Sequence, residues 1–268
     1  MPIITSPDNI QLKQAVSLKQ KKFRDQKQLF LIEGIRLIET ASSAAEIKEC
    51  FYTAEALTNE RCAVLINTLQ DKGCRMYEVS NKLFAKLADT DSPQGIIAVV
   101  DKKHFSLADF PKNDHPPVYV ILDQLQDPGN VGTIIRTAEA SGVDGIIAMR
   151  GTVDIYSPKV IRATMGAVFF LPIVDKVTSV ELHNFITENN INVFATVLSS
   201  TATPCFAVNY KQPSAVILGN EGKGISAETQ ELADTCIYIP MYGKSESLNA
   251  SSAAAMVMYE IMRQRHFN

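Results

Sequence analysis

The second half of the chain alternates short apolar runs with helical stretches, and this alternation is the feature that most constrains the fold. The first run, residues 118–122, is continuously apolar, which is typical of a strand buried on both faces of a parallel sheet. Comparable runs follow at residues 145–149, 169–174, 192–198, 215–218 and 236–239. The intervals have helical patterns, and residues 248–265 read as a long final helix. This alternation predicts a doubly wound parallel sheet.

A linker separates this region from a smaller one. Residues 104–117 contain Pro111, Pro116 and Pro117, which remove backbone donors, among turn-forming polar residues. Before the linker, strand and helix patterns alternate again. We expect helices over residues 9–24, 35–44, 58–72 and 81–88, and strands over residues 28–33, 48–53, 75–79 and 95–101. The sequence therefore predicts a small α/β sandwich over residues 1–103, a linker over 104–117 and a larger α/β domain over 118–268.

Composition excludes several classes of protein. No apolar run approaches the ~20 residues needed to cross a bilayer, and the first six residues lack the basic-then-apolar pattern of a secretory signal. The five cysteines are scattered and form no CxxC pair, which argues against a disulfide framework and a zinc site. We therefore expect a cytoplasmic protein that binds no metal.

Basic residues gather near the N-terminus although the net charge of the chain is −3. Residues 13–27 contain a single acidic residue, Asp25, among the cations Lys13, Lys19, Lys21, Lys22, Arg24 and Lys27. Such a cluster can hold RNA phosphates through charge and counterion release. A solvated helix face would have the same composition, so the cluster alone leaves both interpretations open.

Three polar, glycine-containing segments follow predicted strands, where open parallel sheets bind their ligands. The first, residues 127–136, opens a helix and contains Asn130 and Arg136. Its glycines permit close backbone approach, and a helix N-terminus attracts anions. A well-capped surface helix with an exposed arginine would also fit this segment.

The second and third segments are residues 216–226 and 239–249. The second contains Glu221 and fails the phosphate-binding loop pattern, because Gly224 and not a hydroxyl residue follows Lys223. A tight turn before a helix would explain it equally well. The third leads into the small residues 250–255, which allow another backbone to lie close; an Ala-rich helix of good propensity is the alternative.

Taken together, the three segments resemble the motifs of the SpoU (TrmH-type) branch of the SPOUT methyltransferases. The motifs are Asn130-x-Gly132-x-x-x-Arg136-x-Ala138, Gly219-Asn220-Glu221-Gly222-Lys223-Gly224, and Ile239-Pro240-Met241 with Ser247-Leu248-Asn249-Ala250-Ser251. Residues 162–167 are similar to a fourth signature, with Thr164 where Ser is more usual. The resemblance covers residues 116–268. Residues 30–34 and 91–95 resemble the family's accessory substrate-binding domain, an RNA-binding sandwich of a ribosomal-protein type.

This resemblance implies a deep trefoil knot in the second domain and S-adenosyl-L-methionine as the methyl donor. It implies that backbone groups at Gly219, Ile239 and Leu248 hold the donor, with Thr196 and Met241 nearby. It also implies a homodimer whose interface contains the final helix and the helix of the first motif.

The resemblance assigns methyl transfer to a ribose 2′-OH, with Arg136 in the central role. A guanidinium is a poor base because its pKa lies above ~12, so we expect Arg136 to orient the hydroxyl and to stabilise the developing alkoxide. Four further residues are expected to position Arg136 or the ribose: Asn130, Glu221, Ser247 and Asn249. The residues expected to bind RNA are Arg162, Lys159, Lys21, Lys22 and Arg24.

Other functions remain to be weighed against this one. A non-catalytic RNA-binding or ribosome-assembly protein could share the fold, and a related branch of the superfamily methylates bases. A nicotinamide-dependent oxidoreductase is disfavoured because the dinucleotide fingerprint is absent. By analogy with enzymes that carry an accessory domain, we expect large-subunit rRNA as the substrate first and tRNA second.

Overall fold

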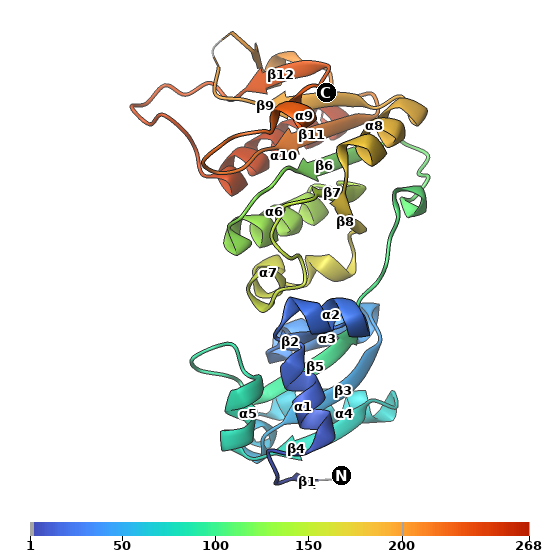
Figure 1. Cartoon of the computed structure of the whole chain (residues 1–268), viewed down its shortest axis with the longest axis vertical. Coiled ribbons are helices and arrows are strands. Elements are labelled where there is room, and N and C mark those ends of the chain that lie inside the picture. Colours follow the sequence, from blue (N-terminus) through green and yellow to red (C-terminus); the bar gives the residue numbers. More distant parts are fainter. Residues whose placement is uncertain (1–2, 200, 268) are drawn as a thin grey trace. The chain divides into compact units, whose positions relative to one another are not determined.

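The computed structural model describes residues 3–199 and 201–267. The chain divides into two compact units, which are described separately (Figure 1). The first unit combines Met1–Lys103 with Tyr156–Phe169, and the second combines His104–Ile155 with Phe170–Asn268. The first unit therefore contains a segment that the sequence analysis assigned to the second domain.

The first unit is built on a mixed five-stranded sheet in the order β1-β4-β3-β5-β2. The first three of these strands run parallel to one another, and β5 is antiparallel to both of its neighbours. The strands are β1 (Ile3–Ile4), β2 (Leu29–Glu33), β3 (Ile47–Tyr52), β4 (Arg75–Val79) and β5 (Ile96–Asp101). The helices are α1 (Ile10–Ser17), α2 (Lys21–Lys27), α3 (Ile35–Ala44), η1 (Ala54–Thr58), α4 (Glu60–Asp71), α5 (Asn81–Leu87), α7 (Pro158–Thr164) and η3 (Ala167–Phe169). The predicted α/β sandwich is confirmed.

One predicted helix in this unit is wrong. Residues 9–24 form two helices, because the chain turns between α1 and α2. The amides of Leu18, Lys19 and Gln20 each bond to the carbonyl three residues earlier, and Gln20 is then extended. The two-residue strand β1 is too short to produce a sequence pattern.

The segment 156–169 packs within the first unit through aromatic rings. The ring centroids of Tyr156 and Phe169 lie 5.0 and 6.3 Å from that of Phe30. The ammonium of Lys102 lies 4.5 Å from the centroid of the Tyr156 ring. Gly166 has a φ of +99°, and a Cβ there would lie 2.8 Å from Thr40 Cγ2, so only glycine fits. Residues outside 1–103 therefore complete this core.

The second unit contains a seven-stranded sheet in the order β10-β12-β9-β11-β6-β7-β8, and every recorded pairing is parallel. Its strands are β6 (Val118–Leu122), β7 (Gly145–Met149), β8 (Ile173–Val177), β9 (Asn192–Thr196), β10 (Thr203–Pro204), β11 (Ser214–Leu218) and β12 (Thr235–Tyr238). Its helices are η2 (Leu107–Asp109), α6 (Pro128–Ala140), α8 (Ser179–Glu188), η4 (Cys205–Ala207), α9 (Ala227–Gln230) and α10 (Ala250–His266). The predicted parallel-sheet fold is confirmed; the trefoil knot stays a prediction.

Helices cover both faces of this sheet, which explains the continuous apolar runs. Tyr119 and Ile121 of β6 belong to a core cluster with Leu182 and Phe185 of α8. Because side chains alternate along a strand, the other residues of β6 face away from α8, and these too are buried. Figure 1 shows α6 and α10 side by side, and the two helices pack against each other.

Two strand predictions in this unit need correction. The run at 169–174 predicted a strand, but β8 begins only at Ile173, because Phe169 packs on Phe30 and Pro172 follows. The edge strand β10 was not predicted, since it contains only two residues.

Candidate active site

Three polar loops of the second unit leave the sheet at the same edge, because they follow the carboxyl ends of the parallel strands β6, β11 and β12. They are residues 123–127, 219–226 and 239–249. The strands β6 and β11 are direct neighbours. The sheet topology therefore brings the three segments identified in the sequence to one place.

The start of α6 fixes the first of these segments. Asp127 is the N-cap, and its Oδ1 accepts a hydrogen bond of 2.8 Å from the amide of Asn130. Pro128 occupies the first helical position, where its missing N–H costs nothing. A Cβ at Gly129 would lie 2.9 Å from Asp127 Oδ1, so glycine leaves room for the cap. These contacts hold Asn130 in the first turn of the helix.

A chain of side-chain hydrogen bonds joins the three loops at Asn130. Its Nδ2 donates to Glu221 Oε1 at 3.1 Å, and its Oδ1 accepts from Asn249 Nδ2 at 2.9 Å. Glu221 and Asn249 are 91 and 119 residues away in the sequence. The structure thus brings together three of the five residues expected to act in catalysis.

The Glu221 carboxylate is also held by the main chain of the first loop. It accepts hydrogen bonds of 3.1 Å from the amides of Gln126 and Asp127. Partial burial raises the pKa of Glu221, but the hydrogen bonds from Asn130 and from backbone amides outweigh that effect, and the net pKa lies below its usual value. Glu221 is therefore an anion and a hydrogen-bond acceptor at neutral pH.

The loop 219–226 folds tightly on itself. The amides and carbonyls of Asn220 and Gly224 bond to each other in both directions at 2.9 Å. A Cβ on Gly219 would lie 2.4 Å from Gly224 C and from the amide nitrogen of Ile225, so no larger residue fits there. Asn220 Nδ2 donates to the carbonyl of Gln124 at 2.8 Å and ties the loop to the β6–α6 connection.

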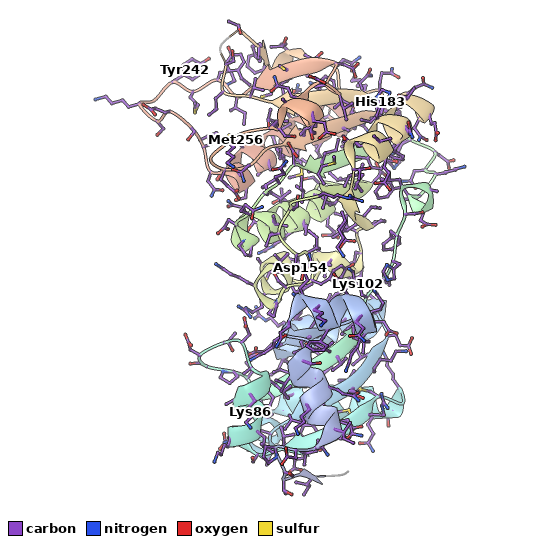
Figure 2. All side chains as sticks on the ribbon, in the orientation of Figure 1. Lys86, Lys102, Asp154, His183, Tyr242 and Met256 are labelled. Atoms are coloured by element: carbon purple, nitrogen blue, oxygen red, sulfur yellow. The ribbon has the colours of Figure 1, made fainter. Side chains whose placement is uncertain are left out.

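The loop 239–249 leaves its main chain available. Within the part of the chain that the structure describes, residues 239–248 make no backbone–backbone hydrogen bond. Tyr242 is 97% exposed and points away from the sheet, as Figure 2 shows. Met241 is exposed, whereas Ile239 and Leu248 are partly buried. Free main-chain donors and acceptors are what a ligand held by backbone groups requires, so Ile239 and Leu248 fit the expected donor site.

The remaining expected donor residue, Thr196, lies at the end of β9. Its hydroxyl donates to the carbonyl of Ile217 at 2.8 Å across the sheet. This bond places Thr196 beside the end of β11, since Ile217 lies two residues before Gly219 in the chain. Together, Gly219 with no room for a side chain and the free main chain of 239–248 fit a ligand gripped by backbone.

Arg136 and Ser247 are not joined to the Asn130 cluster. Arg136 lies on α6 with its side chain exposed, and it makes no hydrogen bond or ion pair with another described residue. Ser247 is exposed in the third loop. The guanidinium of Arg136 therefore keeps its donors for groups outside the described chain.

The residues expected to bind RNA lie in the first unit and differ in availability. Lys21, Lys22 and Lys159 are exposed. Arg162 forms an ion pair of 2.5 Å with Asp89. Arg24 is only 4% exposed, and its Nη1 donates to the carbonyls of Leu18 and Lys19 at 2.7 Å.

Arg24 is thus a structural residue, and we remove it from the proposed RNA-binding set. The sequence could not show this, because burial of a guanidinium depends on which carbonyls the fold places around it. Two positioning contacts were also missed: the cap by Asp127 and the backbone bonds to Glu221. The Asp-Pro pair before a helix was a usable signal for the cap.

The described residues contain no cluster of His, Cys, Asp and Glu side chains suited to a metal ion. No helix in the described ranges is long and apolar enough to cross a membrane. The three loops and α6 offer side-chain amides, carboxylates, hydroxyls, the Arg136 guanidinium and main-chain groups.

A parallel sheet with polar loops at its carboxyl edge is typical of an α/β enzyme that binds its ligand there. The chain belongs to the SpoU rRNA Methylase family, whose model matches residues 117–259. A second model, the MRM3-like substrate binding domain, matches residues 9–98. The chain is accordingly an RNA 2′-O-ribose methyltransferase that uses S-adenosylmethionine, and the predicted family, enzyme class and cofactor are confirmed.

Several proteins resemble it over nearly the whole length. An "uncharacterized tRNA/rRNA methyltransferase" of Synechocystis sp. is 35% identical over 98% of this chain and 94% of its own. The 23S rRNA (guanosine(2553)-2′-O)-methyltransferase of Bacillus subtilis is 33% identical over 97% of this chain and 99% of its own. The crystal structure of an AdoMet-bound rRNA methyltransferase from Sinorhizobium meliloti has a TM-score of 0.84, with 31% identity and 97% of both chains covered.

Proposed function

We propose that the enzyme methylates a ribose 2′-OH in large-subunit rRNA. The observation that carries this proposal is similarity along the full chain to the Bacillus subtilis 23S rRNA enzyme. A 23S rRNA (uridine(2479)-2′-O)-methyltransferase of Streptomyces viridochromogenes is 29% identical over 88% of this chain. By contrast, similarity to the structure of a tRNA-modifying enzyme from A. aeolicus covers only 56% of this chain. tRNA is the second candidate.

The residues proposed to hold the methyl donor have main-chain groups without a backbone hydrogen bond, or a Cα against which other backbone packs closely. Backbone groups of Gly219, Ile239 and Leu248 would grip it, with Thr196 and Met241 beside them. When bound, S-adenosylmethionine supplies an electrophilic methyl group on a sulfonium. Side chains are excluded at Gly219 by the 2.4 Å approach of the segment 224–225, which keeps the donor in contact with main chain.

Arg136 is proposed to act on the ribose hydroxyl. Its guanidinium stays protonated at neutral pH, so it donates hydrogen bonds and does not remove the proton. It would orient the 2′-oxygen and stabilise the negative charge that grows as the proton leaves to an RNA phosphate or to water. The absence of a described partner for Arg136 leaves its donors for this purpose.

The four remaining catalytic candidates are proposed to position the reactants. Glu221 and Asn249 fix the amide of Asn130 from both sides, so that it presents one orientation to the ribose or to Arg136. Ser247 precedes Leu248 in the donor loop and would contact the ribose from there. On the first unit, Lys21, Lys22, Lys159 and Arg162 are proposed to bind RNA phosphates.

We further propose a homodimer formed through α6 and α10. The helix α10 begins with small residues and exposes Met256 and Tyr259, at 49% and 62% (Figure 2 labels Met256). Exposed apolar side chains on a helix that also lies beside Arg136's helix are typical of an interface between subunits. Size-exclusion chromatography with light scattering at micromolar concentration should give the dimer mass; a monomer mass would count against the proposed homodimer.

The test maps 2′-O-methylation in total RNA from cells with and without the gene. Deletion should remove one methylated ribose from large-subunit rRNA, and the wild-type gene should restore it. Arg136→Ala should fail to restore it, with a loss of about 10² or more in rate, whereas the surface control Arg61→Ala should restore it. Loss of a tRNA mark instead would favour the second substrate, and full restoration by Arg136→Ala would refute its role.

A further inference from the structure

Asp123 is a buried carboxylate at the active edge of the sheet. It follows β6 directly and is 1% exposed, unlike the exposed Glu221 nearby. Its Oδ2 accepts a hydrogen bond of 2.6 Å from the amide of Ser226, and its own amide donates to the carbonyl of Leu218 at 2.9 Å. The side chain thus reaches the last residue of the loop 219–226.

That loop is held by the β6–α6 connection at three successive places. Near its start, Asn220 bonds to the carbonyl of Gln124, and the next residue, Glu221, accepts from two amides of the same connection. At its end, the amide of Ser226 bonds to Asp123. The far end of the loop is held by the backbone bonds between Asn220 and Gly224 and by Ile225, which packs against the core. Among the contacts described, Asp123 is the one residue of the β6–α6 connection whose side chain bonds to the segment 224–226.

The end held by Asp123 lies against the proposed donor site. The segment 224–225 passes so close to Gly219 that an added Cβ would lie 2.4 Å from it. Ser226 also caps α9, with its hydroxyl bonded to Thr229. A loss of the Asp123 bond would remove the tie between this segment and the β6–α6 connection, and the backbone packed against Gly219 would loosen.

We propose that Asp123 is a positioning residue for methyl transfer, which holds the loop 219–226 in the shape that the donor and Glu221 require. It touches neither the donor nor the ribose and acts through the amide of Ser226. This inference rests on the proposed donor-binding role of Gly219. A carboxylate suits the task because it is an acceptor only, and burial in a low-dielectric interior strengthens its hydrogen bond electrostatically.

The chain offers a matched control in Asp144. This residue is also a buried carboxylate, 7% exposed, and its Oδ2 accepts from a backbone amide, that of Val118, at 2.7 Å. It lies at the amino edge of the same sheet, just before β7. A role in folding alone predicts the same behaviour for both residues, whereas a positioning role predicts a difference at the donor site.

The experiment compares the full-length wild-type protein with Asp123→Ala, Asp123→Asn, Asp144→Ala and Asp144→Asn. Calorimetry gives the Kd for S-adenosylmethionine without RNA, thermal melting gives Tm, and hydrogen exchange reports on peptides covering 219–226. Methyl transfer to large-subunit rRNA from cells lacking the gene gives KM for the donor and kcat. Calorimetry and exchange need no RNA, so they judge this inference even where the proposed rRNA substrate fails.

We expect Asp123→Ala to raise both the Kd and the KM for the donor about tenfold and to speed exchange in 219–226. Asp123→Asn should rescue most of this, because its amide oxygen still accepts the Ser226 bond. Both Asp144 variants should lower Tm and leave Kd unchanged. Equal Kd values in the Asp123 and Asp144 variants would overturn the proposal. If Asp123→Ala does not fold, the asparagine variants decide. A Kd for Asp123→Asn no higher than that for Asp144→Asn, with unchanged hydrogen exchange in 219–226, would also overturn the proposal.

Discussion

The side chain of Asn130 shows how an amide can be oriented without burial. A side-chain amide has a donor end and an acceptor end. In Asn130 the Nδ2 donates to the Glu221 carboxylate, and the Oδ1 accepts from Asn249. Rotating the amide would place Asn130 Oδ1 against the carboxylate and its Nδ2 against another donor. Two partners with fixed roles therefore set one orientation at a solvent-exposed site.

Asn249→Asp tests this orientation. Asn249 Oδ1 caps α10 by accepting from Ser251 and Ser252 at 2.9 and 3.3 Å, and aspartate caps equally well. The second carboxylate oxygen would face Asn130 Oδ1, two acceptors that repel. We expect kcat to fall by about tenfold or more, with little change in Tm. Asn249→Ala, the comparison variant, should also lose the cap and about 1 kcal/mol of stability. Wild-type kcat in Asn249→Asp would show that the orientation is irrelevant.

The lowered pKa of Glu221 predicts where pH matters. A carboxylate whose pKa is lower in the folded protein contributes fully above its unfolded value of about 4.3, and the contribution is lost only as pH falls through the lower folded value. Between pH 6 and 9 the charge of Glu221 is constant. Single-turnover rates of Glu221→Gln should therefore fall below wild type by one constant factor across that range. A factor that changes with pH would mean that Glu221 titrates during the reaction.

At the scale of elements, α7 forms an ion pair within the first unit that contributes little to the free energy of folding. The side chains of Arg162 and Asp89 are 32% and 38% exposed, and pairs of this kind contribute about 0–1 kcal/mol. The aromatic contacts of Tyr156 and Phe169 with Phe30 are buried and carry the attachment. Arg162 is therefore free to exchange Asp89 for an RNA phosphate at little cost.

This exchange predicts the direction in which Asp89→Asn changes the affinity for RNA. If Arg162 binds phosphate, removing its competitor should strengthen RNA binding about two- to fivefold, by an amount within the range of an exposed pair. Arg162→Ala should weaken binding and lower the slope of log K against log salt by about 1. Filter binding to large-subunit rRNA at several salt concentrations measures both, with Asp71→Asn as the control. Weaker binding by Asp89→Asn would instead identify the pair as an anchor of α7.

At the scale of the whole molecule, the first unit is not a continuous stretch of chain. Its core residue Phe30 is 2% exposed because Tyr156 and Phe169 cover it. A fragment 1–103 would lack both rings and the buried residues of α7. Burying one large apolar side chain contributes roughly 1.5–3 kcal/mol, so the deletion removes a large part of a small domain's stability.

We therefore expect the fragment 1–103 to be less stable than the same unit in the full chain by on the order of 3 kcal/mol. Denaturant unfolding followed by near-ultraviolet circular dichroism measures this difference. A peptide of residues 154–170 added in trans should raise the midpoint, and the same peptide with Tyr156→Ala and Phe169→Ala should not. A fragment as stable as the intact unit would show that the segment 156–169 is dispensable for this core.

The sequence by itself determined the elements and the motifs. The apolar run that forms β6 and the periodic pattern that forms α10 each depend only on residues close together in the sequence. Local periodicity was therefore sufficient to place both elements. It also showed that Asn130, Glu221 and Asn249 follow strands of a parallel sheet, and hence share an edge. It did not separate α1 from α2, since the turn at 18–20 is made by ordinary polar and apolar residues.

Only the tertiary structure decided which side chains meet. The bonds from Asn130 to Glu221 and Asn249 span 91 and 119 residues, and the bond from Ser226 to Asp123 spans 103. Arg24 was expected to bind RNA, but it is buried and its guanidinium donates to a backbone carbonyl of the same unit. The periodicity of a segment shows which of its side chains face a core, but it does not show which residues form the rest of that core. A hydrogen bond or a buried charge, in contrast, needs a particular partner within about 3 Å. The packing of the sheet supplies that partner.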